Sequence, residues 1–541
     1  MMNTLIPALL LLASQDSVDV PLFDGTGPHT RPVSSVPLAQ KYFDQGLNML
    51  YAFHHGEAKR SFRQATKLDP DCAMAWWGLA MANGPHINNM SVPPEDEKEA
   101  HDALVRARST MDDDRPVDKA LIRAASLRFS HPQAKDRNPL DRVFAAEMRK
   151  VWRTYPRDAD AGALFAESMA DLRPWDLWKT DGTPQPGTPE IVATPERVLK
   201  VQPDHPLALH LTIHALEAGL HPEKALPAAD RLLDLQPGLG HNVHMPSHIY
   251  VRTGDWDKAI DSNARAMRVD KDYRAKHTHA PIYRMYMAHN NHMLSFAAMM
   301  VGRGQDAIDA VDQLVAAVPA EVQKAAAPFL DGFFAMPFEA RVRFGRWDDV
   351  LAYPELPDHF PISRALRHAA RAVAFAAKKM PAEAREEQRL FYLARRDPVL
   401  KDAAFGNNKA TDILVVATHL MNGEILVAEG AVDGAVAHLK AGIKAEDALR
   451  YSEPPDWIQP VRHTLGALLL KEGRYREAED VYRADLKKLP NNGWSLYGLS
   501  VCHEKAGRED QAIAARKRFE DVWAQADTKI TSSCLCIPGG E

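Results

Sequence analysis

A spacing of small, aromatic and proline residues that returns about every 34 residues restricts most strongly how this chain can fold. Residues 39–72 carry six marks of the spacing in register: Tyr42, Gly46, Ala58, Phe62, Ala65 and Pro70. Residues 459–492 repeat most of it, with Leu465, Gly466, Gly473, Ala478, Tyr482 and Pro490. Small residues let two helices approach closely, and aromatic residues fill the gaps between stacked helix pairs, so each segment predicts a helix-turn-helix hairpin.

These marks are those of the tetratricopeptide (TPR) repeat. Residues 493–526 continue the pattern with Leu499, Gly507 and Ala512, and weaker matches begin near residues 331, 365 and 416. A repeat that starts at Ala73 is interrupted by an insertion at residues 84–89. We therefore expect an all-α, TPR-type α-solenoid, a right-handed superhelix of about ten helix-turn-helix repeats.

Changes in the regularity of the pattern suggest where the parts of the chain begin and end. The N-terminal repeats contain insertions, and residues 173–187 read as a long ordered loop, because they are rich in Pro, Gly, Asp and Thr. The expected parts are 1–16, a signal peptide or leader; 17–38, an extended segment; 39–158, N-terminal repeats; 159–321, central repeats; 322–526, C-terminal repeats; and 527–541, a tail.

Composition narrows the class of partner. The chain has 66 Lys and Arg against 72 Asp and Glu, a formal net charge of -6, and no basic block that could follow a phosphate backbone. We therefore expect no nucleic acid partner. No run of apolar residues reaches the eighteen or more that a membrane span needs, so we expect no membrane span.

The first residues resemble a short signal peptide, because an apolar stretch from Leu5 to Ala13 precedes polar residues. No Lys or Arg comes before this stretch, and Pro7 interrupts it. This pattern favours a periplasmic or secreted protein. A cytoplasmic protein with an unstructured leader is the alternative.

Histidine is unusually concentrated in the middle of the chain. Of 23 histidines, 11 fall between His205 and His292. Abutting repeat frames at 206–239 and 240–273 place His210 and His214 at the same positions as His244 and His248, and a frame from Ala288 continues the pattern. Because these positions are three and four residues apart, the side chains share one helical face. The seven histidines of this pattern are His210, His214, His241, His244, His248, His289 and His292.

This histidine face is expected to line the concave groove of the solenoid and to bind a transition metal. Neighbouring packed helices lie about 8 to 10 Å apart, so one ion can bridge two helices. Imidazole nitrogen suits Zn, Cu, Ni or Fe, and seven histidines exceed one coordination shell. The alternatives are a polar lining for a peptide and a pH-responsive surface.

Further residues complete the hypothesis. Glu217 and Glu167 are candidate general bases, and Pro246 is expected to kink the helix between His244 and His248. His54 and His55 lie in the turn of the first repeat and are expected at the surface. In the tail, Cys534 and Cys536 can hold a soft ion such as Cu(I) or be oxidised as a pair.

Several segments are similar to a family of bacterial TPR-repeat proteins. They are Tyr42-Phe43-Asp44-Gln45-Gly46-Leu47, Asp69-Pro70-Asp71-Cys72-Ala73-Met74-Ala75-Trp76-Trp77-Gly78, His244-Met245-Pro246-Ser247-His248-Ile249-Tyr250 and Glu453-Pro454-Pro455-Asp456-Trp457. The resemblance runs from about Gly27 to Asp527 and implies the fold without an established activity. The Cys-x-Cys tail departs from this family's usual ending.

Three functions remain open at this point. The first is a metal-binding TPR protein, and the sequence leaves open whether it is also an enzyme. The second is a non-catalytic adaptor that binds a peptide or protein in its concave groove, a common use of repeat solenoids. The third is metal storage or delivery, in which the tail cysteines exchange an ion with the histidines.

Overall fold

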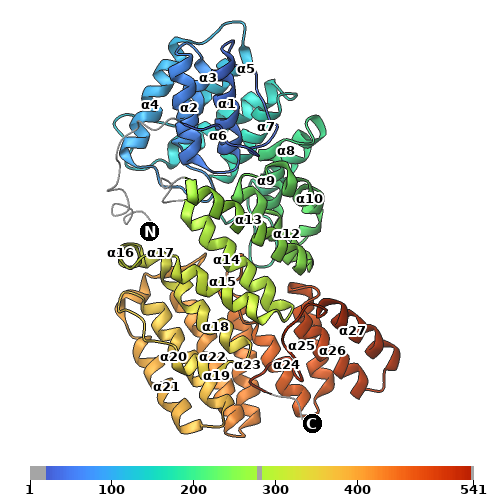
Figure 1. Ribbon diagram of the computed structural model, residues 1–541. Coiled ribbons are helices and arrows are strands. Elements are labelled where there is room, and N and C mark those ends of the chain that lie inside the picture. Colours follow the sequence, from blue (N-terminus) through green and yellow to red (C-terminus); the bar gives the residue numbers. More distant parts are fainter. Residues whose placement is uncertain (1–19, 277–282, 538–541) are drawn as a thin grey trace. The chain divides into compact units, whose positions relative to one another are not determined.

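The computed structural model describes residues 20–276 and 283–537, and helices make up nearly all of its regular structure (Figure 1). The expected leader, residues 1–16, lies outside the described residues. The all-α fold class is confirmed. Contacts divide the chain into two compact units: unit 1 comprises Met1–Ile249 and Ser262–Met287, and unit 2 comprises Tyr250–Asp261 and Ala288–Glu541. The boundary falls within helices α12, α13 and α14, and each unit is described by itself.

Unit 1 is built from consecutive antiparallel helices around one core. Residues 20–36 form a largely non-helical segment before the first helix. The helices are α1 (Pro37–Tyr51), α2 (His55–Leu68), α3 (Ala73–Ala82), α4 (Pro94–Ser109), α5 (Pro116–Ala125), α6 (Asn138–Thr154), α7 (Ala159–Ala170), α8 (Thr188–Val201), α9 (Pro206–Leu216), η1 (Pro222–Ala225), α10 (Leu226–Leu235) and α11 (Gly240–His244), followed by parts of α12 (Pro246–Thr253), α13 (Trp256–Lys276) and α14 (Tyr283–Met300).

Unit 2 continues the succession of helices. Its other elements are α15 (Gly304–Ala316), α16 (Ala320–Ala325), α17 (Ala327–Leu330), η2 (Asp331–Ala335), α18 (Met336–Arg343), α19 (Trp347–Ala352), α20 (Pro361–Ala377), α21 (Pro381–Ala394), η3 (Pro398–Lys401), α22 (Ala410–Ala428), α23 (Val432–Asp447), α24 (Val461–Lys471), α25 (Tyr475–Lys488), α26 (Gly493–Lys505) and α27 (Glu509–Val522). A short hairpin pairs β1 (Ala404–Phe405) with β2 (Asn408–Lys409) in antiparallel register.

The repeat pattern is visible as one packing arrangement that occurs in both units. In unit 1 the ring of Phe62 on α2 lies between Gly46 on α1 and Gly78 on α3, so close that a Cβ on Gly46 would be 2.9 Å from the ring. In unit 2 the ring of Tyr482 on α25 lies in the same way between Gly466 and Gly498. The aromatic residue of each repeat is thus enclosed by its own first helix and the next one, as the TPR pattern predicts.

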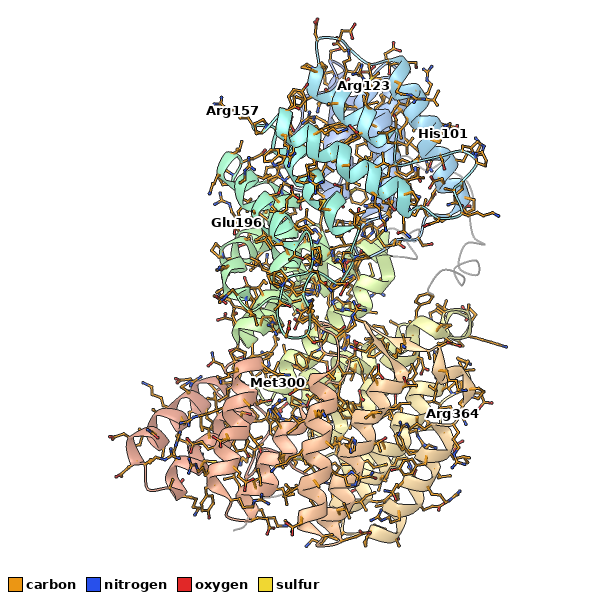
Figure 2. The ribbon with its side chains drawn as sticks, turned by 180° about the vertical axis from the view of Figure 1, so that it is seen from behind. His101, Arg123, Arg157, Glu196, Met300 and Arg364 are labelled. Carbon is orange, nitrogen blue, oxygen red and sulfur yellow. A yellow bond between two sulfur atoms is a disulfide. The ribbon has the colours of Figure 1, made fainter. Side chains whose placement is uncertain are left out.

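Most charged side chains lie at the surface of each unit, and most apolar side chains lie in its core. Charged residues such as Arg123, Arg157, Glu196 and Arg364 point outward from their own units, whereas Met300 is fully buried (Figure 2). Among the described residues one helix, α22, is long and apolar enough to cross a membrane. Of its most apolar stretch 61% is buried, and α22 packs against α20 and α23, as a core helix of a helical array does.

Candidate metal centre

The local sequence determines where the histidine-bearing helices begin and end. Pro206 starts α9 at a position that needs no backbone donor, and the side chain of His205 caps it by accepting from the backbone N–H of Ala208 at 3.2 Å. Pro246 cannot continue the preceding helix, so α11 ends at His244 and α12 begins after Met245. The expected kink between His244 and His248 lies at Met245, where the helix is interrupted for one residue whose backbone stays helical, with φ of -49° and ψ of -39°.

All five predicted histidines of unit 1 are buried. The exposed fraction is 6% for His214 and at most 2% for His210, His241, His244 and His248. The expectation that they line an open concave groove is wrong, because neighbouring helices and the aromatic residue Phe53 enclose the rings. A buried imidazole must satisfy its nitrogens inside the protein, and this requirement makes the hydrogen bonds of the cluster informative.

The first pair of histidines lies on α9. His210 donates from Nδ1 to the backbone carbonyl of Tyr51 at 3.0 Å. His214 donates from Nδ1 to Oε1 of Glu217 at 2.8 Å. The two Nε2 atoms face each other at 3.1 Å.

The second pair repeats this arrangement one repeat later. His248 lies with Nδ1 2.6 Å from the second oxygen of Glu217, Oε2, and His244 lies with Nδ1 2.6 Å from Oδ1 of Asn263. Their Nε2 atoms again face each other, at 2.9 Å. Glu217 thus joins the two pairs, and the predicted equivalence of residues 34 apart in the sequence extends to their contacts.

A count of protons shows what these contacts require. A carbonyl or carboxylate oxygen can only accept, so each of the four Nδ1 atoms carries the hydrogen. A neutral imidazole has one hydrogen, and each Nε2 therefore presents a lone pair. In both pairs two lone pairs point at each other across about 3 Å. A neutral pair of this kind is repulsive, and either a proton shared by the nitrogens or a metal ion between them removes the repulsion.

The spacing of the nitrogens matches that of two ligands on one ion. Two imidazole nitrogens bound at about 2.1 Å lie about 3.4 Å apart at a tetrahedral angle and about 3.0 Å apart at a right angle. The observed separations are 3.1 and 2.9 Å. His241 adds a third nitrogen to the α9 pair, since ligand atoms of His210, His214 and His241 lie within 4.8 Å of one another.

Burial favours, in three of the rings, the neutral form that a metal needs. The pKa values of His210, His241 and His244 lie well below the usual range, because burial and neighbouring histidines disfavour the imidazolium. Glu217 behaves in the opposite way: although burial opposes its charge, His248 and His214 lower the pKa of its carboxyl to about 2. Glu217 is therefore a carboxylate that lies against a ring nitrogen of His214 and of His248.

Aromatic side chains surround the cluster. The ring of Phe53 lies 4.4 Å from His210 and 5.9 Å from His241, and the ring of Trp175 lies edge-on to His214 at 5.4 Å. Phe53 and Trp175 have φ angles of 54° and 55°, a left-handed conformation that is unfavourable for residues other than glycine. Strained residues of this kind cluster at functional sites. Trp175 belongs to the loop that was expected to be ordered.

Sequence reasoning missed residues next to this cluster. His86 stacks on Phe53 at 4.4 Å and lies 4.4 Å from His55. His54 is buried and His55 is half-buried, so the expectation that they lie at the surface is wrong. The only available signal was the position of His86 in the insertion that interrupts the second repeat.

The two predicted bases differ in their surroundings. Both oxygens of Glu217 contact ring nitrogens. Such contacts are expected of a residue that orients ligands, and they leave Glu217 poorly placed to take a proton from a substrate. Glu167, on α7, is buried beside Asp171, and burial together with the charge of Asp171 raises the pKa of its carboxyl. Arg128 binds Asp171 at 2.5 Å and opposes this shift.

The last two predicted ligands belong to unit 2. His289 and His292 share α14, with ring centroids 6.1 Å apart. The ring of His292 packs against Phe333 at 5.3 Å, and burial lowers the pKa of His292 to about 3.

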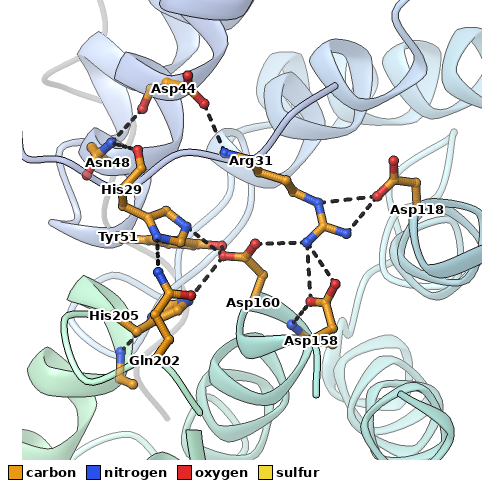
Figure 3. A network of polar contacts seen from close by, with 12 residues as sticks. His29, Arg31, Asp44, Asn48, Tyr51, Asp118, Asp158, Asp160, Gln202 and His205 are labelled. Carbon is orange, nitrogen blue, oxygen red and sulfur yellow. Dashed lines mark hydrogen bonds and ion pairs between the residues drawn. The ribbon is translucent and has the colours of Figure 1, made fainter. Parts of the chain in front are cut away.

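A second histidine group in unit 1, which the sequence did not reveal, has no place for a cation (Figure 3). His29, His205 and Tyr51 donate to one oxygen of Asp160 at 2.9, 3.1 and 2.7 Å, and Arg31 donates to the other oxygen at 2.8 Å. Each ring accepts at its remaining nitrogen: His29 from Gln202 at 3.0 Å and His205 from the backbone of Ala208. Every nitrogen is satisfied, so the group has a structural role and fixes residues 20–36 to α1, α7 and α9.

The tail is folded. Cys534 and Cys536 form a disulfide, Cys534 is buried, and Cys536 is half-buried against α22. The sequence expectation that this pair can be oxidised agrees with this arrangement. Binding of a soft ion would require the disulfide to be reduced first.

No protein-family model matches this chain, and no curated protein matches it. Among solved structures, it is similar to a chain of the APC/C heterotetramer Cut9–Hcn1, with 12% identity, a TM-score of 0.30 and coverage of 93% of this chain and 77% of that chain. It is also similar to human IFIT1 bound to m7Gppp-AAAA, with 14% identity, a TM-score of 0.31 and 91% of each chain covered. These values are too low to indicate a function.

Proposed function

We propose that unit 1 is a transition-metal-binding TPR module whose ligands are His210, His214, His241, His244 and His248. The observation that carries the proposal is the close approach of two Nε2 atoms in both histidine pairs, with each Nδ1 atom within 3.0 Å of an oxygen. Imidazole ligands favour Zn, Cu, Ni or Fe over Mg or Ca.

The ligands divide into two groups. His210, His214 and His241 supply three nitrogens, the number that zinc uses in catalytic sites with one position left open. His244 and His248 supply two more. Glu217 contacts a ring in each group, so two ions whose histidine ligands share one orienting carboxylate fit this arrangement. A bound ion would polarise a substrate or exchange electrons, depending on the metal.

The test is the metal content of protein that is purified without an affinity tag. We expect a stoichiometric transition metal by elemental analysis, and its loss in the His244→Ala/His248→Ala variant. The matched control is His101→Ala/His221→Ala, which removes two more accessible histidines of unit 1 and should retain the metal. Circular dichroism of each variant separates loss of the site from loss of the fold.

A different result would replace the proposal. If the native protein is isolated without metal and takes up none of Zn, Cu, Ni or Fe on reconstitution, the centre does not bind metal. The non-catalytic adaptor would then be the leading function. Metal that is retained in native stoichiometry by the His244→Ala/His248→Ala variant would limit the site to the α9 group and His241.

A Cys534→Ser/Cys536→Ser variant tests the storage and delivery alternative. Faster or slower metal transfer to a chelator, with an unchanged affinity, would support it. Unchanged transfer would exclude the tail from the metal chemistry.

A further inference from the structure

The C-terminal tail is packed into unit 2 at a definite place. Ser533 is fully buried: its hydroxyl is 2.6 Å from that of Tyr482 and donates to the carbonyl of His463 at 2.8 Å. Ile537 is 1% exposed. These contacts fix the disulfide between Cys534 and Cys536 over α22 and α24, beside a small pocket with room for about one water molecule.

A buried carboxyl group lies against both sulfurs. Oε1 of Glu424, on α22, is 2.8 Å from Sγ of Cys536 and 3.8 Å from Sγ of Cys534. Glu424 is 3% exposed, and burial raises the pKa of its carboxyl to about 8. Thr464 bonds to this carboxyl and partly opposes the shift. Glu424 therefore carries a proton at neutral pH, next to the atoms that would need one.

The charged residue that shares this pocket is held by other groups. Arg343 lines the pocket but bonds to Nδ1 of His463 at 2.8 Å, and its guanidinium lies 3.6 Å over the ring of Trp494. A buried acid that keeps its proton beside a reactive pair is typical of functional sites.

Stability gives little reason for this disulfide. A disulfide stabilises a fold mainly by restricting the unfolded chain, and the restriction grows with the length of the loop that it closes. Here the two cysteines are separated by a single residue. In addition, half-buried Cys536 gives an attacking thiolate access, whereas Cys534 is covered.

We propose that Cys534 and Cys536 are a redox-active pair that exchanges two electrons with a dithiol, and that Glu424 exchanges the proton. A thiolate of the dithiol attacks Sγ of Cys536, the S–S bond breaks, and the electron pair passes to Sγ of Cys534, which takes the proton of Glu424. The second thiolate of the dithiol then displaces Cys536, which is protonated by solvent. The dithiol leaves as its disulfide, and solvent reprotonates Glu424.

The proposal is independent of the metal centre in unit 1 and is tested on the full-length oxidised protein. Dithiothreitol is the probe, and N-ethylmaleimide labelling followed by peptide mass spectrometry is the readout. We expect a label on Cys536 under native conditions, while the buried thiols Cys534, Cys72 and Cys502 react only after unfolding. In Glu424→Gln, reduction at pH 7 should be slower by about tenfold or more, because the proton donor is lost.

The control is Glu429→Gln, which changes an exposed glutamate that caps the same helix. The disulfide of this variant should be reduced at the native rate. Reduction of the disulfide only after unfolding would make the bond purely structural and overturn the proposal. An unchanged rate in Glu424→Gln would remove Glu424 from the step.

Discussion

At the scale of single residues, Glu217 is the residue that links the two histidine pairs of the proposed metal centre. Its two oxygens lie 2.8 Å from Nδ1 of His214 and 2.6 Å from Nδ1 of His248, and Nε2 of each ring faces the other histidine of its pair. The sequence predicted that the histidines share a helical face, because their spacing follows the repeat. It did not predict the role of Glu217, since that role depends on how two abutting repeats pack.

Replacing Glu217 with Gln tests this role. The amide group of Gln has a hydrogen donor where one carboxylate oxygen was, so one of the two histidines must change its tautomer or lose its bond. We expect an affinity for Zn that is about 10- to 100-fold lower in a competition titration against a chromophoric chelator, as when other residues that orient metal ligands are changed. Glu223→Gln, at an exposed pair with His221, should keep the native affinity. Native affinity in Glu217→Gln would contradict the role.

Glu424 makes a separate prediction about pH. Its pKa is raised from 4.5 to about 8 in the folded protein, so the unfolded chain ionises first and stability falls as pH rises toward and through 8. Between pH 7 and 8.5 this one group should cost about 1 kcal/mol. Urea unfolding of the oxidised protein should show this loss in the native chain and not in Glu424→Gln. Buried histidines with a lowered pKa titrate below this pH range. Other buried acids are present in both the native chain and Glu424→Gln, so their effects cancel in the comparison.

At the scale of helices, the sequence predicted the contacts that recur with the repeat. Glycines and aromatic residues recur with the repeat, and both units use them in the same contact, around Phe62 and Tyr482. The segment at residues 20–36 could not be predicted in this way. It is fixed by Asp160, which is 131 residues from His29 in the chain and belongs to no repeating pattern.

Two helical glycines of unit 1 provide a matched test of the repeat packing. A Cβ on Gly78 would overlap the ring of Phe62, whereas a Cβ on Gly56 has no atom within 4 Å. We expect Gly78→Ala to destabilise the protein by about 1–3 kcal/mol through overpacking. Gly56→Ala should be neutral or stabilising by up to about 1 kcal/mol, because Ala favours the helix. If the two substitutions change the thermal stability equally, the contact between Gly78 and Phe62 does not require a glycine.

At the scale of the whole molecule, the repeat pattern predicts one continuous array of helices. The contacts within the chain instead form two units, and each unit contains a different candidate site. The histidine pairs linked by Glu217 belong to unit 1, and the disulfide with Glu424 belongs to unit 2. A ligand that binds only the folded form of one unit stabilises that unit by mass action. Metal should therefore act on the two units unequally.

Hydrogen exchange measured by mass spectrometry tests this directly. At about 100 times the dissociation constant, a metal ion adds about 2.7 kcal/mol, so amides of α9 and α11 that exchange through unfolding of unit 1 should slow by about 100-fold. Amides of α24–α27, in unit 2, serve as the internal reference and should exchange at the same rate with and without metal. In the His244→Ala/His248→Ala variant the protection of α11 should be lost. Equal slowing in both units of the native protein would mean that the metal acts through the whole chain, and that the histidine pairs are not an independent centre.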